Sequence, residues 1–273
     1  MSLFFRKRRV LVFGDSHVEA LQQALQERGA TRRGITIEAF YRKVPAMNGG
    51  FRGDTTLDEF KERAQELGPK DMVVSMLMGN FHHMVGMVQH PEPYDFLLPG
   101  DDTSPEDGTT LIPYKVLEDF FLRRLSKENE PVRFFRRRTD ACVCHLMAPP
   151  PKESTKYILQ GPQVFLRMHI KERGVSPAPL RQKFWRLQKR VMEQIFADYE
   201  VPLIPVPKEC LSERGFLREE YSAPDATHAN KEYGKLLIKQ IEKLVRAQTG
   251  KKTSKAMGRR KKLTPKQKGT EAA

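Results

Sequence analysis

The stretch Arg9-Val-Leu-Val-Phe-Gly-Asp-Ser-His17 decides the fold, because a short apolar run ends there at a glycine and two polar residues. The run at 10–13 has the composition of a buried strand, and apolar residues at helical spacing follow it over 18–25. Ser16 therefore stands at a predicted strand-to-helix turn. We expect Gly14 to adopt a backbone conformation there that other residues resist.

The position of Ser16 has two interpretations. At such a turn a hydroxyl clears the carboxyl edge of the sheet, and the first N–H groups of the helix point toward an incoming anion. Both features favour a nucleophile. Serine is also a preferred helix N-cap, which gives Ser16 a purely structural alternative. The choice depends on whether the chain supplies a base, a group that orients the base and oxyanion donors.

Length and composition predict an ordinary folded domain. The 273 residues suit one α/β domain or two small ones, and no apolar run is long enough to cross a membrane. Phe4-Phe5 is too short for a secretory signal, so we expect a cytoplasmic protein. Cys142 and Cys144 lie in a strand-like run, where their spacing suits a disulfide poorly, in agreement with a reducing compartment.

The formal net charge of +14 is concentrated at the end of the chain. Residues 251–273 carry a net +8, and the other 250 residues only +6. We therefore expect a folded domain over 1–247 and a disordered basic tail over 248–273. The tail is predicted to be solvated, with weak contact to an acidic polymer, nucleic acid or a membrane surface as the alternative.

Strand and helix patterns alternate along the chain. Strands are predicted at 9–14, 34–41, 71–80, 141–147 and 201–206, and helices at about 18–28, 57–67, 114–127, 181–199 and 233–244. This order predicts a flavodoxin-like, three-layer α/β/α fold with a five-stranded, mostly parallel sheet. The prolines at 202 and 205 predict an edge strand. The irregular segment 81–140 is interpreted as an inserted lid or wall.

Four polar features follow the predicted strands. Ser16 follows the first strand, the loop 49–56 the second, Asn80 the third, and Asp225 with His228 the fifth. In open parallel sheets, ligands bind outside the carboxyl ends of the strands. Four independent features at one edge favour a site over the N-cap interpretation.

These residue types suit acyl chemistry. A serine hydroxyl becomes a strong nucleophile when a base accepts its proton and a third group orients that base. His228 suits the base and Asp225 the orienting carboxylate. The oxyanion donors would be the N–H of Ser16, a glycine N–H of the loop 49–56 and the side-chain amide of Asn80.

The four blocks resemble those of the SGNH (GDSL-type) hydrolase superfamily, in its order and near its spacings, over residues 9 to 245. The blocks are Gly14-Asp15-Ser16, Gly53-Asp-Thr-Thr56, Gly79-Asn80 and Asp225-Ala-Thr-His228. The resemblance implies a catalytic triad of Ser16, Asp225 and His228 and an oxyanion hole of Ser16, Gly53 and Asn80, without a metal or cofactor. Gly49 and Gly50 compete with Gly53 for the donor role. His17 and Phe81 depart from the family pattern and leave the subfamily open.

The resulting prediction is a serine esterase that cleaves a carboxylic ester, such as an O-acetyl sugar, a lipid or a small acyl ester. The alternatives are acyl transfer to another alcohol and a non-catalytic binding module whose working part is the basic tail. Further candidates for the pocket are Asp15, His17, Gly49, Gly50 and His82. The histidines at 17, 82, 83 and 145 match no zinc-site spacing, so no metal is expected.

Overall fold

The computed structural model describes residues 7–46, 49–101, 104–159 and 169–260. Its main sheet has the strand order β10-β9-β6-β1-β3-β2. The strands are β1 (Arg8–Gly14), β2 (Thr31–Arg32), β3 (Ile35–Tyr41), β6 (Met72–Met76), β9 (Cys142–Leu146) and β10 (Leu203–Ile204). All neighbours pair in parallel except β2, which pairs antiparallel with β3. The predicted flavodoxin-like order of five parallel strands is confirmed.

Two differences from the predicted strands have local causes. β2 was not predicted, because it is only two exposed residues long and pairs with the polar start of β3. β6 ends at Met76, earlier than expected, since the backbone turns into a left-handed conformation at Met78 (φ 57°). As predicted, β10 is an edge strand: it pairs only with β9 and is two residues long.

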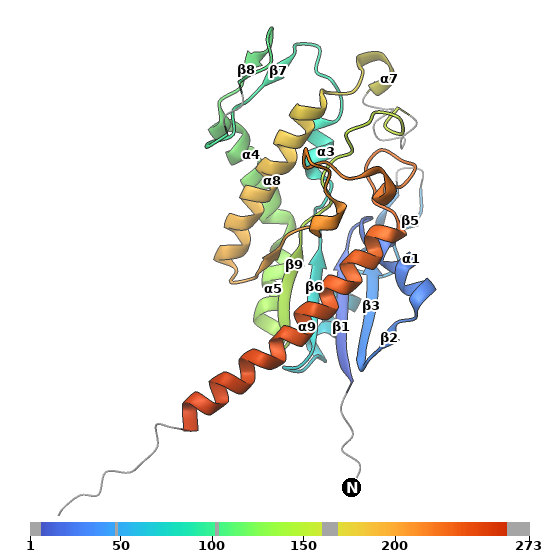
Figure 1. The fold of residues 1–273 in the computed structure, drawn as a ribbon, viewed down its shortest axis with the longest axis vertical. Helices are drawn as coiled ribbons and strands as arrows, with labels where there is room; N and C mark the ends of the chain where they lie inside the picture. Colours follow the sequence, from blue (N-terminus) through green and yellow to red (C-terminus); the bar gives the residue numbers. More distant parts are fainter. Residues whose placement is uncertain (1–6, 47–48, 102–103, 160–168, 261–273) are drawn as a thin grey trace, which may run out of the picture.

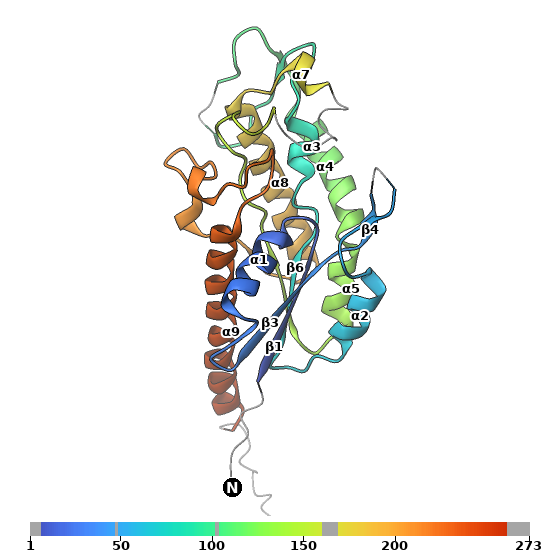
Figure 2. The same ribbon diagram turned by 90° about the vertical axis from the view of Figure 1, so that its right-hand side faces the viewer.

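Helices cover both faces of the sheet. They are α1 (Val18–Arg28), α2 (Leu57–Gln65), α3 (Phe81–Gly86), α4 (Tyr114–Glu128), α5 (Glu130–Arg138), α7 (Ile170–Arg173), α8 (Ala178–Asp198) and α9 (Lys231–Arg260). Figure 2 shows α1 and α9 on one face and α2 with α5 on the other. β1 and β6 are buried between these layers, as their continuous apolar sequences predict.

The segment 81–140, interpreted as a lid or wall, has two parts. Its α5 contacts α2 and β9, so it belongs to the helical layer on the sheet. The small two-stranded sheet of β7 (Tyr94–Asp95) and β8 (Thr110–Leu111) lies at the far end of the molecule, beyond the carboxyl ends of the main strands (Figure 1). A lid function for this part stays a prediction.

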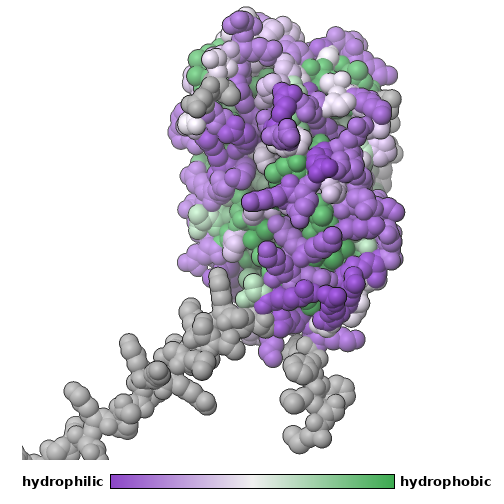
Figure 3. Space-filling view, viewed as in Figure 1, coloured by the Kyte–Doolittle hydropathy of each residue, from purple (hydrophilic) through white to green (hydrophobic). Residues whose placement is uncertain are grey.

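The last helix, α9, packs on the folded domain at its start and extends beyond it at its end (Figure 1). α9 packs on α1 and continues to Arg260, into the segment expected to be a disordered tail, while residues 261–273 lie outside the described residues (Figure 1). No helix in the described part is long and apolar enough to span a membrane. The face seen in Figure 3 is mainly hydrophilic, with small apolar patches between the charged groups.

Candidate active site

The carboxyl edge of the sheet brings the predicted blocks together. Ser16 stands between the end of β1 and the start of α1, and His228 lies shortly before the start of α9. Since α1 and α9 pack side by side with their N-termini at this edge, two residues 212 positions apart in sequence meet (Figure 2).

A continuous chain of hydrogen bonds joins three of the predicted residues. The Oγ of Ser16 lies 2.7 Å from the Nε2 of His228. The Nδ1 of the same ring lies 3.0 Å from the Oδ2 of Asp225. The His228 side chain is 24% exposed, so a substrate can reach the pair. This is the arrangement of a nucleophile, a base and an orienting carboxylate.

Local hydrogen bonds hold Asp225 in its charged form. Its Oδ1 accepts the backbone N–H groups of Thr227 and His228, at 2.8 Å each. Burial alone would raise the pKa of this carboxyl, but the side chain of His228 and the two N–H donors outweigh it and lower the pKa well below its usual range. Asp225 therefore stays ionised and can orient His228 at neutral pH.

Lys152, which was not among the residues predicted from the sequence, supports the loop that carries Asp225. Its buried ammonium donates to the carbonyl oxygens of Ala223 and Asp225, at 2.5 Å each, and lies 3.9 Å from Asp225 Oδ1. Burial lowers its pKa to about 8, although the charge of Asp225 acts in the opposite direction. A lysine directly after the prolines that stop the fourth predicted strand was the available signal.

The N-cap interpretation of Ser16 is wrong. The N-cap position of α1 is His17, and no side-chain bond caps this helix. The helix starts one residue later than that interpretation requires, so the Ser16 hydroxyl is left to pair with His228.

The expected role of Gly14 also needs correction. Gly14 is not among the residues with a positive φ, so backbone freedom is not the reason for a glycine here. A Cβ at this position would lie 2.6 Å from the Cβ of Met76 on the neighbouring strand β6. Gly14 lets β1 and β6 approach closely just before the nucleophile turn.

The three candidate glycines differ in their surroundings. Gly53 has a φ of 85°, and a Cβ there would lie 2.3 Å from the carbonyl oxygen of Arg42, directly after β3. Gly49 and Gly50 are exposed in the turn between β4 (Val44–Pro45) and β5 (Phe51–Arg52), and the Gly49 N–H already donates to Ala46. Of the three, Gly53 is therefore the one held against the end of β3, and Gly49 has no free N–H.

Asn80 lies at the start of α3 and is bonded to the residue after the nucleophile. Its Oδ1 is 3.0 Å from the Nε2 of His17, a ring that is 3% exposed. Asn80 is the N-cap residue of α3, yet its side chain makes no capping bond. The amide thus remains available to the site.

Two other side chains that were predicted to line a pocket are instead hydrogen-bonded within the protein. Asp15 accepts Arg42 Nε at 2.8 Å and the Met78 N–H at 2.7 Å, so its carboxylate joins the ends of β1, β3 and β6. His82 does not line an opening, because its ring is buried and 3.2 Å from the Oε1 of Gln188 on α8. Polar residue types alone did not distinguish such internal bonds from a pocket. No group of three or more potential metal ligands is found in the described part of the chain.

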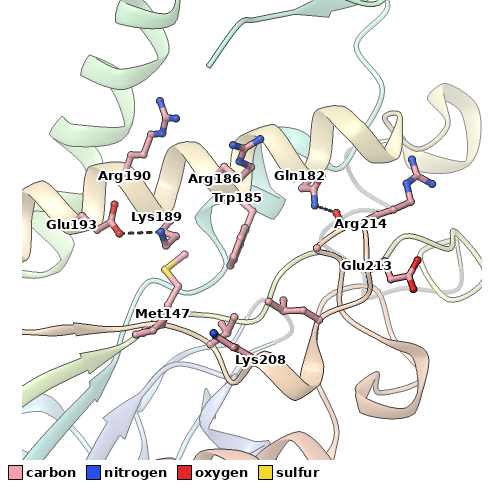
Figure 4. A pocket seen from close by; sticks show the side chains of 14 residues that line it. Met147, Gln182, Trp185, Arg186, Lys189, Arg190, Glu193, Lys208, Glu213 and Arg214 are labelled. Carbon is pink, nitrogen blue, oxygen red and sulfur yellow. Dashed lines mark hydrogen bonds and ion pairs between the residues drawn. The ribbon is translucent and has the colours of Figure 1, made fainter. Parts of the chain in front are cut away.

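A separate pocket, whose lining includes neither Ser16 nor His228, lies between α8 and the loop around residues 208–215 (Figure 4). It is rich in cations, but several already have acidic partners. Lys189 pairs with Glu193 at 3.0 Å, and Arg186 pairs with Asp101. These ion pairs neutralise much of its charge, so the pocket does not define an anion site.

The chain was compared with protein families, curated proteins and solved structures. No family model and no curated protein matches the chain. Among solved structures, it is similar to a GDSL-like lipase from Bacteroides thetaiotaomicron, with 14% identity, 88% of this chain and 89% of that chain covered, and a TM-score of 0.44. It is also similar to a carbohydrate acetylesterase from Sinorhizobium meliloti, with 14% identity, 88% of this chain and 99% of that chain covered, and a TM-score of 0.44. An aryl esterase from M. smegmatis has 14% identity, with 87% of this chain and 99% of that chain covered, and a TM-score of 0.43.

The four sequence blocks, not these structures, carry the resemblance of the chain to SGNH hydrolases. At these TM-scores the structural similarity carries no conclusion about its activity, which has to come from the geometry of its own residues.

Proposed function

We propose that this protein is a serine hydrolase that cleaves a carboxylic ester through an acyl-enzyme on Ser16. The observation that carries the proposal is the hydrogen-bond chain from Ser16 through His228 to Asp225. Each group in it has the chemistry that its place requires: a hydroxyl, an imidazole and an ionised carboxylate.

In the first half-reaction, Ser16 Oγ attacks the ester carbonyl carbon and His228 Nε2 accepts the hydroxyl proton. Asp225 keeps the Nδ1 proton of His228 in place and stabilises the imidazolium that forms. The C–O bond to the alcohol then breaks, and His228 returns the proton to the departing alkoxide. The acyl group remains on Ser16.

The negative charge on the carbonyl oxygen needs donors at the same edge of the sheet. We assign them to the N–H groups of Ser16 and Gly53 and to the side-chain amide of Asn80. One donor of this kind lowers the barrier by about 3–4 kcal/mol. In the second half-reaction, His228 Nε2 takes a proton from water as the water oxygen attacks the acyl carbon. The bond between that carbon and Ser16 Oγ then breaks, His228 returns the proton to Ser16 Oγ, and the carboxylic acid leaves. An O-acetyl sugar, a lipid or a small acyl ester would each fit this chemistry.

The proposal is tested with a fluorophosphonate, which reacts with activated serines. We expect one adduct on Ser16 by mass spectrometry, at a rate reduced at least about 100-fold in His228→Ala, because loss of the base removes proton transfer. Ser75 is an internal control. Its Oγ lies 3.0 Å from His145 Nδ1, but it is fully buried in β6 and should not react.

A screen of aryl and sugar acetates with the wild type and Ser16→Ala then identifies the ester. A folded wild type that shows neither an adduct nor ester cleavage would refute the proposal. Labelling without hydrolysis, but with acyl transfer to an added alcohol, would assign the transferase alternative.

A further inference from the structure

The ring of His17 is the least explained polar group beside the site. It is directly next to the nucleophile in sequence, yet it points into the protein and is buried. Its centroid lies 5.2 Å from that of His228, in an edge-to-face arrangement. Gly79 makes room for it, since a Cβ on Gly79 would lie 2.6 Å from His17 Cδ2.

The protonation state of His17 follows from its surroundings. Burial, and then the charge of nearby His228, lower its pKa to about 3, so the ring is neutral near neutral pH. A neutral imidazole has one N–H, and the carbonyl oxygen of an amide can only accept. The 3.0 Å contact with Asn80 Oδ1 therefore places the proton of His17 on Nε2.

The same bond fixes the orientation of the Asn80 amide. With Oδ1 bonded to His17, the NH₂ group must point away from that ring. Within the described chain, Asn80 Nδ2 donates to no protein acceptor, and the side chain is partly exposed. The backbone carbonyl of Asn80, not its side chain, accepts from the following turn of α3. The amide donors are thus free and held in one orientation.

We infer that His17 is a positioning residue, which fixes Asn80 so that its NH₂ group faces the oxyanion. The inference rests on the proposed function. It explains why a buried, neutral histidine follows the nucleophile: without the Nε2–H bond, the amide can rotate and present its carbonyl oxygen, which would repel the oxyanion. His17 itself touches no reacting atom.

The test compares two amides at position 17 that differ in reach. Glutamine places an N–H near the position of His Nε2, whereas asparagine places it near that of Nδ1, away from Asn80. We expect His17→Gln to keep labelling by the fluorophosphonate within about threefold of the wild type, and His17→Asn and His17→Leu to slow it at least about 10-fold. With p-nitrophenyl acetate as substrate, the loss should fall on kcat, with KM little changed, because the oxyanion exists only in the transition state.

A double-mutant cycle shows whether His17 acts through Asn80. Asn80→Ala should slow labelling about 100- to 1000-fold, and adding His17→Leu to it should cause no further loss. An equal loss from His17→Leu in both backgrounds would overturn the inference, as would wild-type rates for His17→Asn and His17→Leu. The free energy of unfolding in urea, measured for each variant, identifies any variant with a folding defect. The labelling rates of the folded His17→Gln and His17→Asn variants then decide whether His17 positions Asn80. A wild type that is not labelled at all would instead refute the proposed function, and this inference with it.

Discussion

The two aspartates near Ser16, Asp15 and Asp225, have different hydrogen-bond partners, although both lie in polar motifs of the sequence. Asp15 precedes Ser16 but is bonded to Arg42 and the Met78 N–H, so it holds strand ends together. Asp225 orients His228. Both carboxylates accept backbone N–H groups, so the difference is in the side chain that each one hydrogen-bonds: a guanidinium for Asp15 and an imidazole for Asp225.

Asp225→Asn should therefore impair the base without unfolding the loop. The Asn Oδ1 can still accept the N–H groups of Thr227 and His228, but an amide does not stabilise an imidazolium as a carboxylate does. We expect kcat for ester hydrolysis to fall by about 100- to 10,000-fold. Steady-state kinetics on the ester identified in the screen measure this loss.

Asp71→Asn is the matched control. Asp71 is a buried carboxylate at the other end of the sheet, where it accepts the backbone N–H groups of Arg9 and Gly68. Its change should alter the free energy of unfolding but not the rate of Ser16 labelling. Equal kinetic losses in the two variants would contradict a specific role for Asp225.

At the scale of elements, the distance from Ser16 to His228 depends on how α1 and α9 pack. Each helix follows one of the two residues, so a shift between the helices moves Ser16 relative to His228. Gly234 in α9 permits the close approach, since a Cβ there would lie 1.9 Å from the carbonyl oxygen of Ala20 in α1.

Gly234→Ala should thus weaken both folding and activity. Overpacking a core contact costs about 1–3 kcal/mol of unfolding free energy. We also expect slower labelling of Ser16 in the folded fraction, because α9 must move away from α1. Lys239→Ala, on the exposed side of the same helix, should change neither quantity. Urea titration and the labelling rate measure the two effects, and unchanged values for Gly234→Ala would show that this contact does not set the site.

At the scale of the whole molecule, buried neutral histidines make stability depend on pH. Burial lowers the pKa of His17, His82 and His145 to about 3, and that of His83 well below its usual range. Between pH 6.5 and about 3 the unfolded chain binds protons at these positions that the folded chain does not. Stability should therefore be lost as the pH falls through this window.

Each such histidine contributes at most about 1.4 kcal/mol per pH unit, which urea unfolding between pH 7.5 and 4.5 can measure. His145→Asn keeps a polar partner near Ser75 but cannot be protonated, so its unfolding free energy should depend less steeply on pH. Exposed His90→Gln is the control and should leave the slope unchanged. The same slope in His145→Asn and the wild type would contradict this account.

The sequence predicted the features that depend on local pattern. The apolar runs gave the five parallel strands, and placing polar residues after them brought Ser16, Asp225 and His228 to one edge, where the structure joins them. Spacing in sequence does not reveal tertiary contacts. The need for Gly14 comes from Met76 on another strand, and the burial of His82 comes from Gln188 on α8.

Lys152 was missed for the same reason, because only the folded chain places its ammonium under the loop 223–225. His17 was recognised as a departure from the family pattern, but its partner Asn80 is 63 residues away. The residues proposed to react can be predicted from their chemical type, whereas the residues that hold them in place become visible only in the folded chain.

The long separation of Ser16 and His228 in sequence has a consequence for biosynthesis. A growing polypeptide acquires Ser16 first and His228 only 212 residues later. Until the segment with His228 has left the ribosome and α9 has docked on α1, Ser16 has no base. The proposed enzyme would thus be inert throughout its synthesis and become reactive only when the newly made chain closes on itself.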